Sequence, residues 1–354
     1  HKCGQPPGAA AETKRYQRDV GDGGEGTMDA LVNAQRGTFH EVEVTGPLRE
    51  RVNARFGVIG EGRIAVVELA EASGLALVDR TKRDPARCTT YGTGELIRAA
   101  MDCGCKDTII CLGGSATVDG GAGIAQALGA RFFDASGDLI EQPLCGGLLK
   151  HVSRVDRRAM ILPSSLVAAC DVTIPLCGPG GAAAEFGPQK GAAPAQVIEL
   201  DRGLRHLAMI VGGDATAPGT GSAGGAGFGL MSLWGARLER GIEIILDAVR
   251  FDDRCRGADL VLTGEGRLDS QSLHGKACMG VARRAAALGV PTIAIVGSIG
   301  EGAADCLDQA KGASLRGFVS LADRFGVERA MREPAALIEA VAREMLESRL
   351  QQGA

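Results

Sequence analysis

The chain has 354 residues, of which 45% are hydrophobic and 23% charged, and its formal net charge is −4. These values are ordinary for a globular protein, and at ~150 residues a domain the length predicts two domains. The weakly acidic charge without a basic tract argues against nucleic-acid binding, and no apolar run reaches the ~18 residues of a membrane span.

Glycine is the one abnormal residue type, with 53 copies, about 15% of the chain against a usual ~7%. The glycines follow no third-residue period, which excludes a collagen-like chain. We expect the excess in loops where the backbone approaches something closely. The eleven cysteines are irregularly spaced and include no CxxC pair. They predict neither a disulfide framework nor a zinc site, and they favour a reducing, cytoplasmic location.

The first elements predicted along the chain are antiparallel strands. Apolar and polar residues alternate over 40–44 and 52–58 around Thr45-Gly46-Pro47, and a third apolar run covers 64–69. This pattern predicts a hairpin followed by a third strand.

The rest of the chain alternates between buried strands and helices. Apolar runs that end in glycine or a carboxylate occupy 108–112, 166–170, 260–262 and 293–296. Such runs are typical of strands buried on both faces, as in parallel sheets. Helical patterns cover 121–128, 197–211 and 280–288, while 212–229 is predicted to be a long glycine loop. The alternation predicts an α/β fold with a mixed sheet.

Five clusters combine glycine with hydroxyl and charged residues, at 22–27, 89–95, 113–121, 186–191 and 263–276. The third cluster lies between a strand and a helix, where backbone N–H groups can hold an anion, although a glycine turn that only packs the helix explains it equally well. The fifth cluster follows a strand, where α/β sheets bind ligands, and the alternative is a solvated charged loop. The Walker A motif is missing, and no G-x-G-x-x-G follows a first strand, so neither common nucleotide motif applies.

These clusters, in this order, resemble the bacterial glycerate kinase family, type I and glycerate 2-kinase-like, which is unrelated to the MOFRL-containing enzymes. The resemblance rests on DGGEGT at 22–27, VTGPL at 44–48, ASGL at 72–75, TTYGTGELI at 89–97, GGSATVDGGAG at 113–123, ACDV at 169–172, PLCGP at 175–179, FGPQKGA at 186–192, GTGSAGGAG at 219–227 and TGEGRLDSQSLHGK at 263–276.

The resemblance implies ATP-dependent phosphorylation of D-glycerate to 2-phosphoglycerate with Mg²⁺. It also implies two α/β domains with the active site between them. One is a discontinuous Rossmann-like domain, residues 1–80 plus 255–354, and the other is an inserted flavodoxin-like domain, residues 81–254. Glycerate and ATP are the expected partners, without nucleic acid or membrane, and the sequence leaves open whether the chain forms a homo-oligomer.

The reaction that the resemblance implies suggests a hypothesis for the roles of residues in the clusters. Asp269 or Asp171 is expected to orient the attacking hydroxyl and accept its proton, and Lys276 completes the catalytic set. Substrate or phosphate binding is assigned to Arg267, Lys190, Gly114, Ser115, Thr117 and His274. Magnesium is assigned to Glu265 and Asp22, because carboxylates are its preferred side-chain ligands.

The sequence departs from the family pattern in three places. The family opens with a strand and a Pro-Asp-Ser-Phe-Lys stretch, and residues 1–20 contain nothing similar, so we expect this N-terminal motif to be missing. Val118 and Ile174 stand where the family usually has asparagine. A catalytically impaired member that binds glycerate or a nucleotide is therefore the alternative. A hydroxy-acid dehydrogenase ranks third, because the dinucleotide fingerprint is missing.

Overall fold

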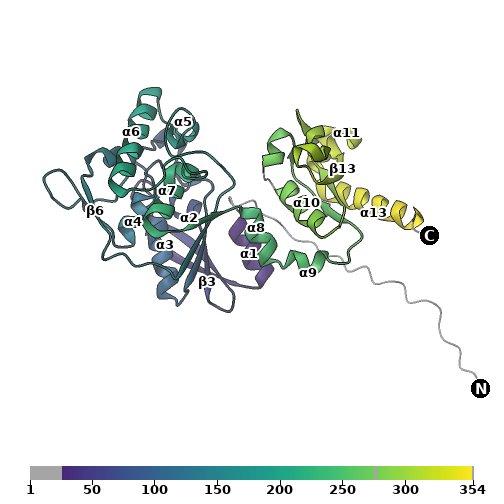
Figure 1. Ribbon diagram of the computed structural model, residues 1–354, viewed down its shortest axis with the longest axis horizontal. Coiled ribbons are helices and arrows are strands. Elements are labelled where there is room, and N and C mark those ends of the chain that lie inside the picture. The colour runs from purple at the N-terminus through teal and green to yellow at the C-terminus, as the bar shows by residue number, and fades with distance from the viewer. Residues whose placement is uncertain (1–25, 275–276, 353–354) are drawn as a thin grey trace, which may run out of the picture.

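The computed structural model describes residues 26–274 and 277–352. They form two lobes, as Figure 1 shows, and helices α8 (Gly241–Ala248) and α9 (Phe251–Cys255) lie where the lobes meet. We call residues 26–249 the N-terminal lobe, and residues 251–274 with 277–352 the C-terminal lobe. Each lobe is built around its own sheet, so the predicted α/β fold is confirmed.

The strands of the N-terminal lobe are β1 (Thr38–Thr45), β2 (Arg51–Ile59), β3 (Ile64–Glu68), β4 (Asp107–Cys111), β5 (Arg131–Phe133), β6 (Arg154–Asp156), β7 (Ser165–Ala169) and β8 (Arg237–Glu239). Those of the C-terminal lobe are β9 (Val261–Thr263), β10 (Arg267–Leu268), β11 (Thr292–Val296), β12 (Ser298–Ile299) and β13 (Leu315–Ser320).

The other α-helices are α1 (Thr27–Gln35), α2 (Leu69–Ser73), α3 (Tyr91–Asp102), α4 (Ala122–Ala127), α5 (Ala182–Phe186), α6 (Pro194–Val211), α7 (Ser222–Trp234), α10 (Ala277–Ala287), α11 (Leu321–Phe325), α12 (Val327–Arg332) and α13 (Pro334–Gln352). The 3₁₀ turns are η1 (Leu75–Leu77), η2 (Arg80–Lys82), η3 (Gly146–His151), η4 (Pro188–Lys190), η5 (Ser270–His274), η6 (Ala303–Leu307) and η7 (Gln309–Lys311).

The N-terminal sheet is mixed, with strand order β1-β2-β3-β4-β7-β8. Strands β1 and β2 form the predicted antiparallel hairpin, in which Thr38 pairs with Val58 and Thr45 with Arg51. Strand β3 is antiparallel to β2 and parallel to β4, and the parallel arrangement continues through β7 and β8. Four parallel strands therefore end at the same edge of the sheet, where α/β proteins place their ligands.

Helices cover both faces of this sheet. Side chains of α3, α4 and α7 share one buried cluster with Val67 and Ile110, whereas α1 and α8 share another with the neighbouring Val66 and Cys111. Alternate residues of β3 thus point to opposite faces, as the period of a strand requires. Both faces are apolar because both are covered, which explains the continuous apolar runs in the sequence.

The C-terminal sheet is smaller and entirely parallel, in the order β13-β11-β9. One face packs on α10 through Met279 and Ala294, and the other packs on α11 to α13 through Ile295 and Leu337. The short parallel pair β10–β12 extends from the ends of β9 and β11. The predicted strands at 260–262 and 293–296 are therefore confirmed within one residue.

The domain division from the sequence, residues 1–80 plus 255–354 and residues 81–254, stays a prediction. Its boundary at residue 80 falls between β3 and β4, which pair over five residues from Ile64–Asp107 to Glu68–Cys111. Separating them would leave the hydrogen-bonding edges of two buried strands without partners. The shared sheet therefore favours a division in which residues 38–68 belong with the middle of the chain.

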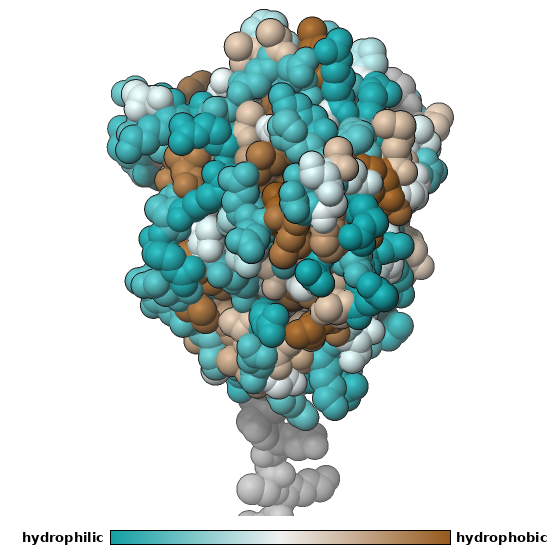
Figure 2. Space-filling view, turned by 90° about the vertical axis from the view of Figure 1, so that its left-hand side faces the viewer, coloured by the Kyte–Doolittle hydropathy of each residue, from teal (hydrophilic) through white to brown (hydrophobic). Residues whose placement is uncertain are grey.

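The surface of the N-terminal lobe is mixed in polarity. Figure 2 shows the outer face of the N-terminal lobe, where small apolar patches are separated by hydrophilic residues, as is common on protein surfaces. Among the residues that the structure describes, no helix combines the length and apolar character that a bilayer span requires.

The prediction of a loop over the whole of 212–229 is wrong in its second half. Helix α7 begins at Ser222, although Ala223, Gly224 and Gly225 have left-handed dihedral angles at its start. Burial outweighs the low helix propensity of glycine here, because the helix packs against residues 117–121. A Cβ on Gly224 would lie 1.9 Å from the Thr117 carbonyl oxygen, and one on Gly229 would lie 2.3 Å from that of Gly120.

Gly224→Ala should therefore destabilise the N-terminal lobe strongly. Its φ of +69° and the backbone contact penalise any side chain, and together we expect a loss of about 2–4 kcal/mol of unfolding free energy. Gly235→Ala is the matched control, because Gly235 has a φ of +67° but no atom within 4 Å of the added Cβ. Denaturant unfolding measures both variants, and equal losses would show that the close contact contributes nothing.

Candidate functional site

The glycine cluster 113–121 lies at the carboxyl end of β4. Gly114 has a φ of +64°, is exposed, and accepts a 2.7 Å hydrogen bond from the Leu75 N–H through its carbonyl. Ser115 is only 7% exposed and forms an isolated bridge with Gly74. Of the residues predicted to hold phosphate here, Gly114 is thus the one open to solvent, so its backbone can approach a ligand.

Asp119 organises this loop from inside. Its carboxylate is fully buried and accepts hydrogen bonds from the Thr90 N–H and hydroxyl, both at 2.8 Å, and from the Gly121 N–H at 3.1 Å and the Gly123 N–H at 3.4 Å. Burial raises the pKa of Asp119, and the four donors oppose that rise. The carboxylate thereby ties the threonine-rich cluster 89–95 to the cluster 113–121.

Lys190 reaches the same loop from η4. Its ammonium donates to the Ser115 hydroxyl at 2.7 Å and to the Thr117 carbonyl at 2.8 Å, and the residue is 3% exposed. Burial lowers the pKa of Lys190 to about 7, while the negative charge of Asp119 opposes the shift. The structure thus brings Lys190, Ser115 and Thr117 together, with the lysine acting as an internal brace of the loop.

The Thr117 side chain is fully buried, and its hydroxyl has no hydrogen-bond partner among the described residues. Val118 is also fully buried and belongs to an apolar cluster with Leu144 and Leu204. The departure from asparagine at this position therefore fills the core in this conformation. Ile174 is partly buried and lies near Gly221, whose added Cβ would be 3.0 Å from the Ile174 Cγ2.

Two acidic side chains occupy the carboxyl ends of the neighbouring parallel strands. Asp171 follows β7, is partly exposed, and its Oδ1 accepts a 3.1 Å hydrogen bond from the Gly241 N–H at the start of α8. Glu68 ends β3, is 5% exposed, and accepts a 2.8 Å hydrogen bond from the Met28 N–H at the start of α1. Burial raises the pKa of Glu68, and the N–H groups of Met28 and Gly26 oppose the shift.

Sequence reasoning did not single out Glu68 or Asp119 as site residues. The available signal for Glu68 is an acid at the end of an apolar strand, the same pattern that identified Asp171. For Asp119 the signal is its position between a buried strand and a helix that is preceded by two glycines, since such an acid can accept hydrogen bonds from several free N–H groups.

The remaining described candidates cluster in the C-terminal lobe, after β9. The Ser272 hydroxyl donates to the Glu265 Oε1 at 2.6 Å and accepts from the Asp269 N–H at 3.2 Å. The Arg267 Nε lies 3.6 Å from the Asp269 Oδ2, with 65% of the Arg267 side chain and 22% of the Asp269 side chain exposed. Two carboxylates and one guanidinium are thus held on a short, internally bonded segment.

The predicted site residues therefore form two groups, one at the strand ends of each lobe. Asp171 and the Lys190–Ser115–Thr117 group belong to the N-terminal lobe, and Glu265, Arg267 and Asp269 to the C-terminal lobe. Asp22, Lys276 and the side chain of His274 lie outside the described residues.

The magnesium assignment depends on how this ion is usually held. Protein-bound Mg²⁺ commonly takes one or two carboxylates together with substrate phosphates, rather than a cage made only of side chains. In the described part of the chain no three potential His, Cys, Asp or Glu ligands gather around one point. Glu265, oriented by Ser272, fits the more open arrangement.

The lowered pKa of Lys190 predicts a pH-dependent stability. Because an unfolded lysine has a pKa of ~10.4, the unfolded chain keeps a proton that the folded chain loses between about pH 7 and 10.4. The unfolding free energy should therefore rise with pH in this window, by at most about 1.4 kcal/mol per pH unit, relative to Lys190→Met.

Denaturant unfolding at pH 6.5, 8.0 and 9.5 measures this difference. Lys150→Met, at an exposed lysine of η3, is the control. A constant difference between the native protein and Lys190→Met across the three pH values would contradict the assignment.

Comparison with known proteins identifies the family. The model of the glycerate kinase family matches residues 8–349. A glycerate kinase of Halalkalibacterium halodurans is 43% identical over 333 residues, covering 92% of this chain and 86% of the relative. The glycerate 2-kinase of Escherichia coli is 46% identical over 288 residues, covering 79% of this chain and 75% of the relative.

A solved structure that is similar to this chain points to the same family. The crystal structure of a protein described as glycerate kinase 2 from Salmonella typhimurium LT2 has a TM-score of 0.75 and 43% sequence identity, and the match covers 92% of this chain and 88% of that one. The similarity in sequence and the similarity in fold extend over the same large part of the chain. The resemblance seen in the motifs is thus confirmed, and this chain belongs to the glycerate kinase family.

Proposed function

We propose that this protein catalyses the ATP-dependent phosphorylation of D-glycerate at its C2 hydroxyl, giving 2-phosphoglycerate and ADP. The observation that carries the proposal is the 46% identity, over 288 residues, to a protein named glycerate 2-kinase. The two groups of site residues support it, because phosphoryl transfer needs in-line positioning and neutralisation of charge rather than covalent chemistry by the protein.

In this reaction the C2 oxygen attacks the γ-phosphorus, the bond to the β-phosphate oxygen breaks, and ADP leaves. Asp171 or Asp269 orients the hydroxyl and accepts its proton. Arg267, beside Asp269, offers a planar fork that suits the glycerate carboxylate or a phosphate. The exposed backbone at Gly114 is the candidate phosphate contact of the N-terminal lobe, and Lys276 and His274 are candidates next to α10.

Mg²⁺ is the expected ion of this reaction, and when bound it would offset the charge of the phosphates. Glu265 and Asp22 are the candidate ligands. The Ser272 hydroxyl, 2.6 Å from the Glu265 Oε1, fixes the orientation of that carboxylate.

We expect the enzyme to act in the cytoplasm. Ten cysteines of the described residues are free thiols, and unpaired thiols are typical of a reducing compartment. Glycerate and ATP are the proposed partners, and we expect no nucleic-acid partner. A measurement of molecular mass in solution would test whether the protein forms a homo-oligomer.

A coupled assay with ATP, D-glycerate and Mg²⁺ tests the function. We expect ADP release that depends on D-glycerate, with 2-phosphoglycerate identified by ³¹P NMR. Thermal shifts with each ligand distinguish the alternatives, because a ligand that binds the folded state raises its stability. Thermal shifts without turnover would favour the impaired binder suggested by Val118 and Ile174. The absence of both thermal shifts and turnover would contradict the proposal.

Asparagine substitutions identify the base. Asp269→Asn and Asp171→Asn keep the shape and hydrogen-bonding oxygen of each side chain, including the acceptor for the Gly241 N–H, but remove the charge. The variant that loses the base should lose ~10²–10⁴-fold in kcat with an unchanged Tm. Asp138→Asn, in an exposed loop, is the control. Near-normal kcat in both variants would remove both residues from the mechanism.

A further inference from the structure

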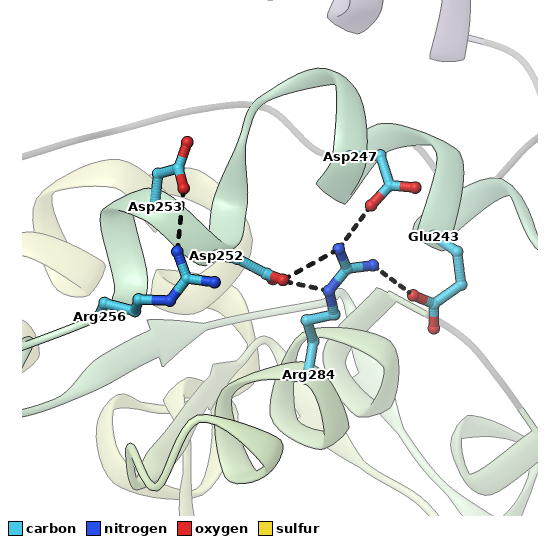
Figure 3. Close-up of polar contacts among 6 residues, drawn as sticks. All are labelled: Glu243, Asp247, Asp252, Asp253, Arg256 and Arg284. Carbon is cyan, nitrogen blue, oxygen red and sulfur yellow. Dashed lines mark hydrogen bonds and ion pairs between the residues drawn. The ribbon is translucent and has the colours of Figure 1, made fainter.

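Figure 3 shows that Arg284 of the C-terminal lobe contacts two carboxylates of the N-terminal lobe and one carboxylate of its own lobe. From α10, its Nη1 lies 3.1 Å from the Glu243 Oε2 and its Nη2 lies 2.5 Å from the Asp247 Oδ1, both on α8. Its Nε lies 2.7 Å from the Asp252 Oδ1 on α9. Only 26% of the arginine side chain is exposed, so these charges are screened less than those of a fully exposed pair.

The ion pairs lie beside an apolar contact between the same helices. Ile242 and Leu246 of α8 form a buried cluster with Val281 of α10. The helices approach so closely that a Cβ on Gly280 would lie 2.6 Å from the Ile242 Cγ1. Arg284 therefore lies beside a tight contact between the two helices, and its planar guanidinium can bind several carboxylates at once.

Each of these helices also leads to one group of site residues. The first residue of α8, Gly241, donates its N–H to Asp171. Helix α10 follows directly after the segment 263–276 and packs on η5 and β9, so its position sets that of Glu265 and Asp269. The contact between α8 and α10 therefore connects the site residues of the N-terminal lobe with those of the C-terminal lobe.

We propose that Arg284 is a positioning residue for phosphoryl transfer: by binding Glu243 and Asp247 it holds the segment 263–274 in register with Asp171. The inference rests on the proposed function, because it assigns the two groups to one reaction. Arg284 touches neither group itself. Its removal should therefore leave the binding groups within each lobe intact while losing their mutual alignment, to which transfer rates are sensitive.

Arg284→Met tests the proposal, because it keeps most of the side-chain length and removes the charge. We expect kcat to fall roughly 10- to 100-fold, in line with an ångström-scale misplacement, with KM for glycerate and ATP within about threefold. Arg284→Lys keeps the charge without the fork and should restore part of kcat. Arg202→Met, which breaks an exposed ion pair with Glu199 on α6, is the matched control and should behave as the native protein.

Substitution of the carboxylates that bind Arg284 gives a second test. The double variant Glu243→Gln/Asp247→Asn removes the link from α8 and should lower kcat in the same way. Combined with Arg284→Met it should add little, because groups that share one interaction are not additive. If Arg284→Met does not fold, this double variant decides the question with the same measurements.

Amide hydrogen exchange tests the role of Arg284 independently of the proposed kinase activity. Amides of 263–274 should exchange faster in Arg284→Met than in Arg202→Met, whether or not the native protein phosphorylates glycerate. A native protein without kinase activity would refute the proposed function alone. Unchanged exchange, or a kcat within twofold of the native value in the folded variant, would overturn the role of Arg284.

Discussion

Helix α8 packs its apolar side chains into both lobes, and the relation between the two sheets depends on this double packing. Ile244 and Ile245 enter the cluster under the N-terminal sheet, while Ile242 and Leu246 face α10. A helix with apolar residues on two sides must be covered on two sides. The lobes are therefore held together by burial as well as by charge, and this packing defines the relative position of the predicted site residues at their strand ends.

Within the N-terminal lobe the glycine loops are organised by backbone contact. Asp119 collects N–H groups from two of the clusters, Lys190 braces a third segment against them, and α7 lies directly on the loop through Gly224 and Gly229. Side chains in place of the hydrogens of Gly224 and Gly229 would keep α7 and the loop apart. The glycine excess of the sequence thus supports the packing of loops on one another, and only the exposed end of the cluster, at Gly114, is open to a ligand.

The strands that could be predicted from the sequence are those whose signal is local. The hairpin of β1 and β2 alternates in polarity, and β4, β7, β9 and β11 are short apolar runs. Strand β13 contains Arg316 and Gly317, which obscure the pattern. Helix α7 begins in glycines whose helical state is imposed by tertiary contact. Arg284 lies 32 to 41 residues from its three carboxylates, so nothing near it in the sequence indicates its role.

The order of the strands in the N-terminal sheet has a consequence for how the chain is made. Strands β1, β2, β3, β4, β7 and β8 are neighbours in the order in which they occur in the sequence. Each new strand therefore adds to an edge that already exists, and the sheet needs no residue beyond Glu239. During synthesis this lobe can assemble as it leaves the ribosome, with α8 completing its second face before the C-terminal lobe has emerged.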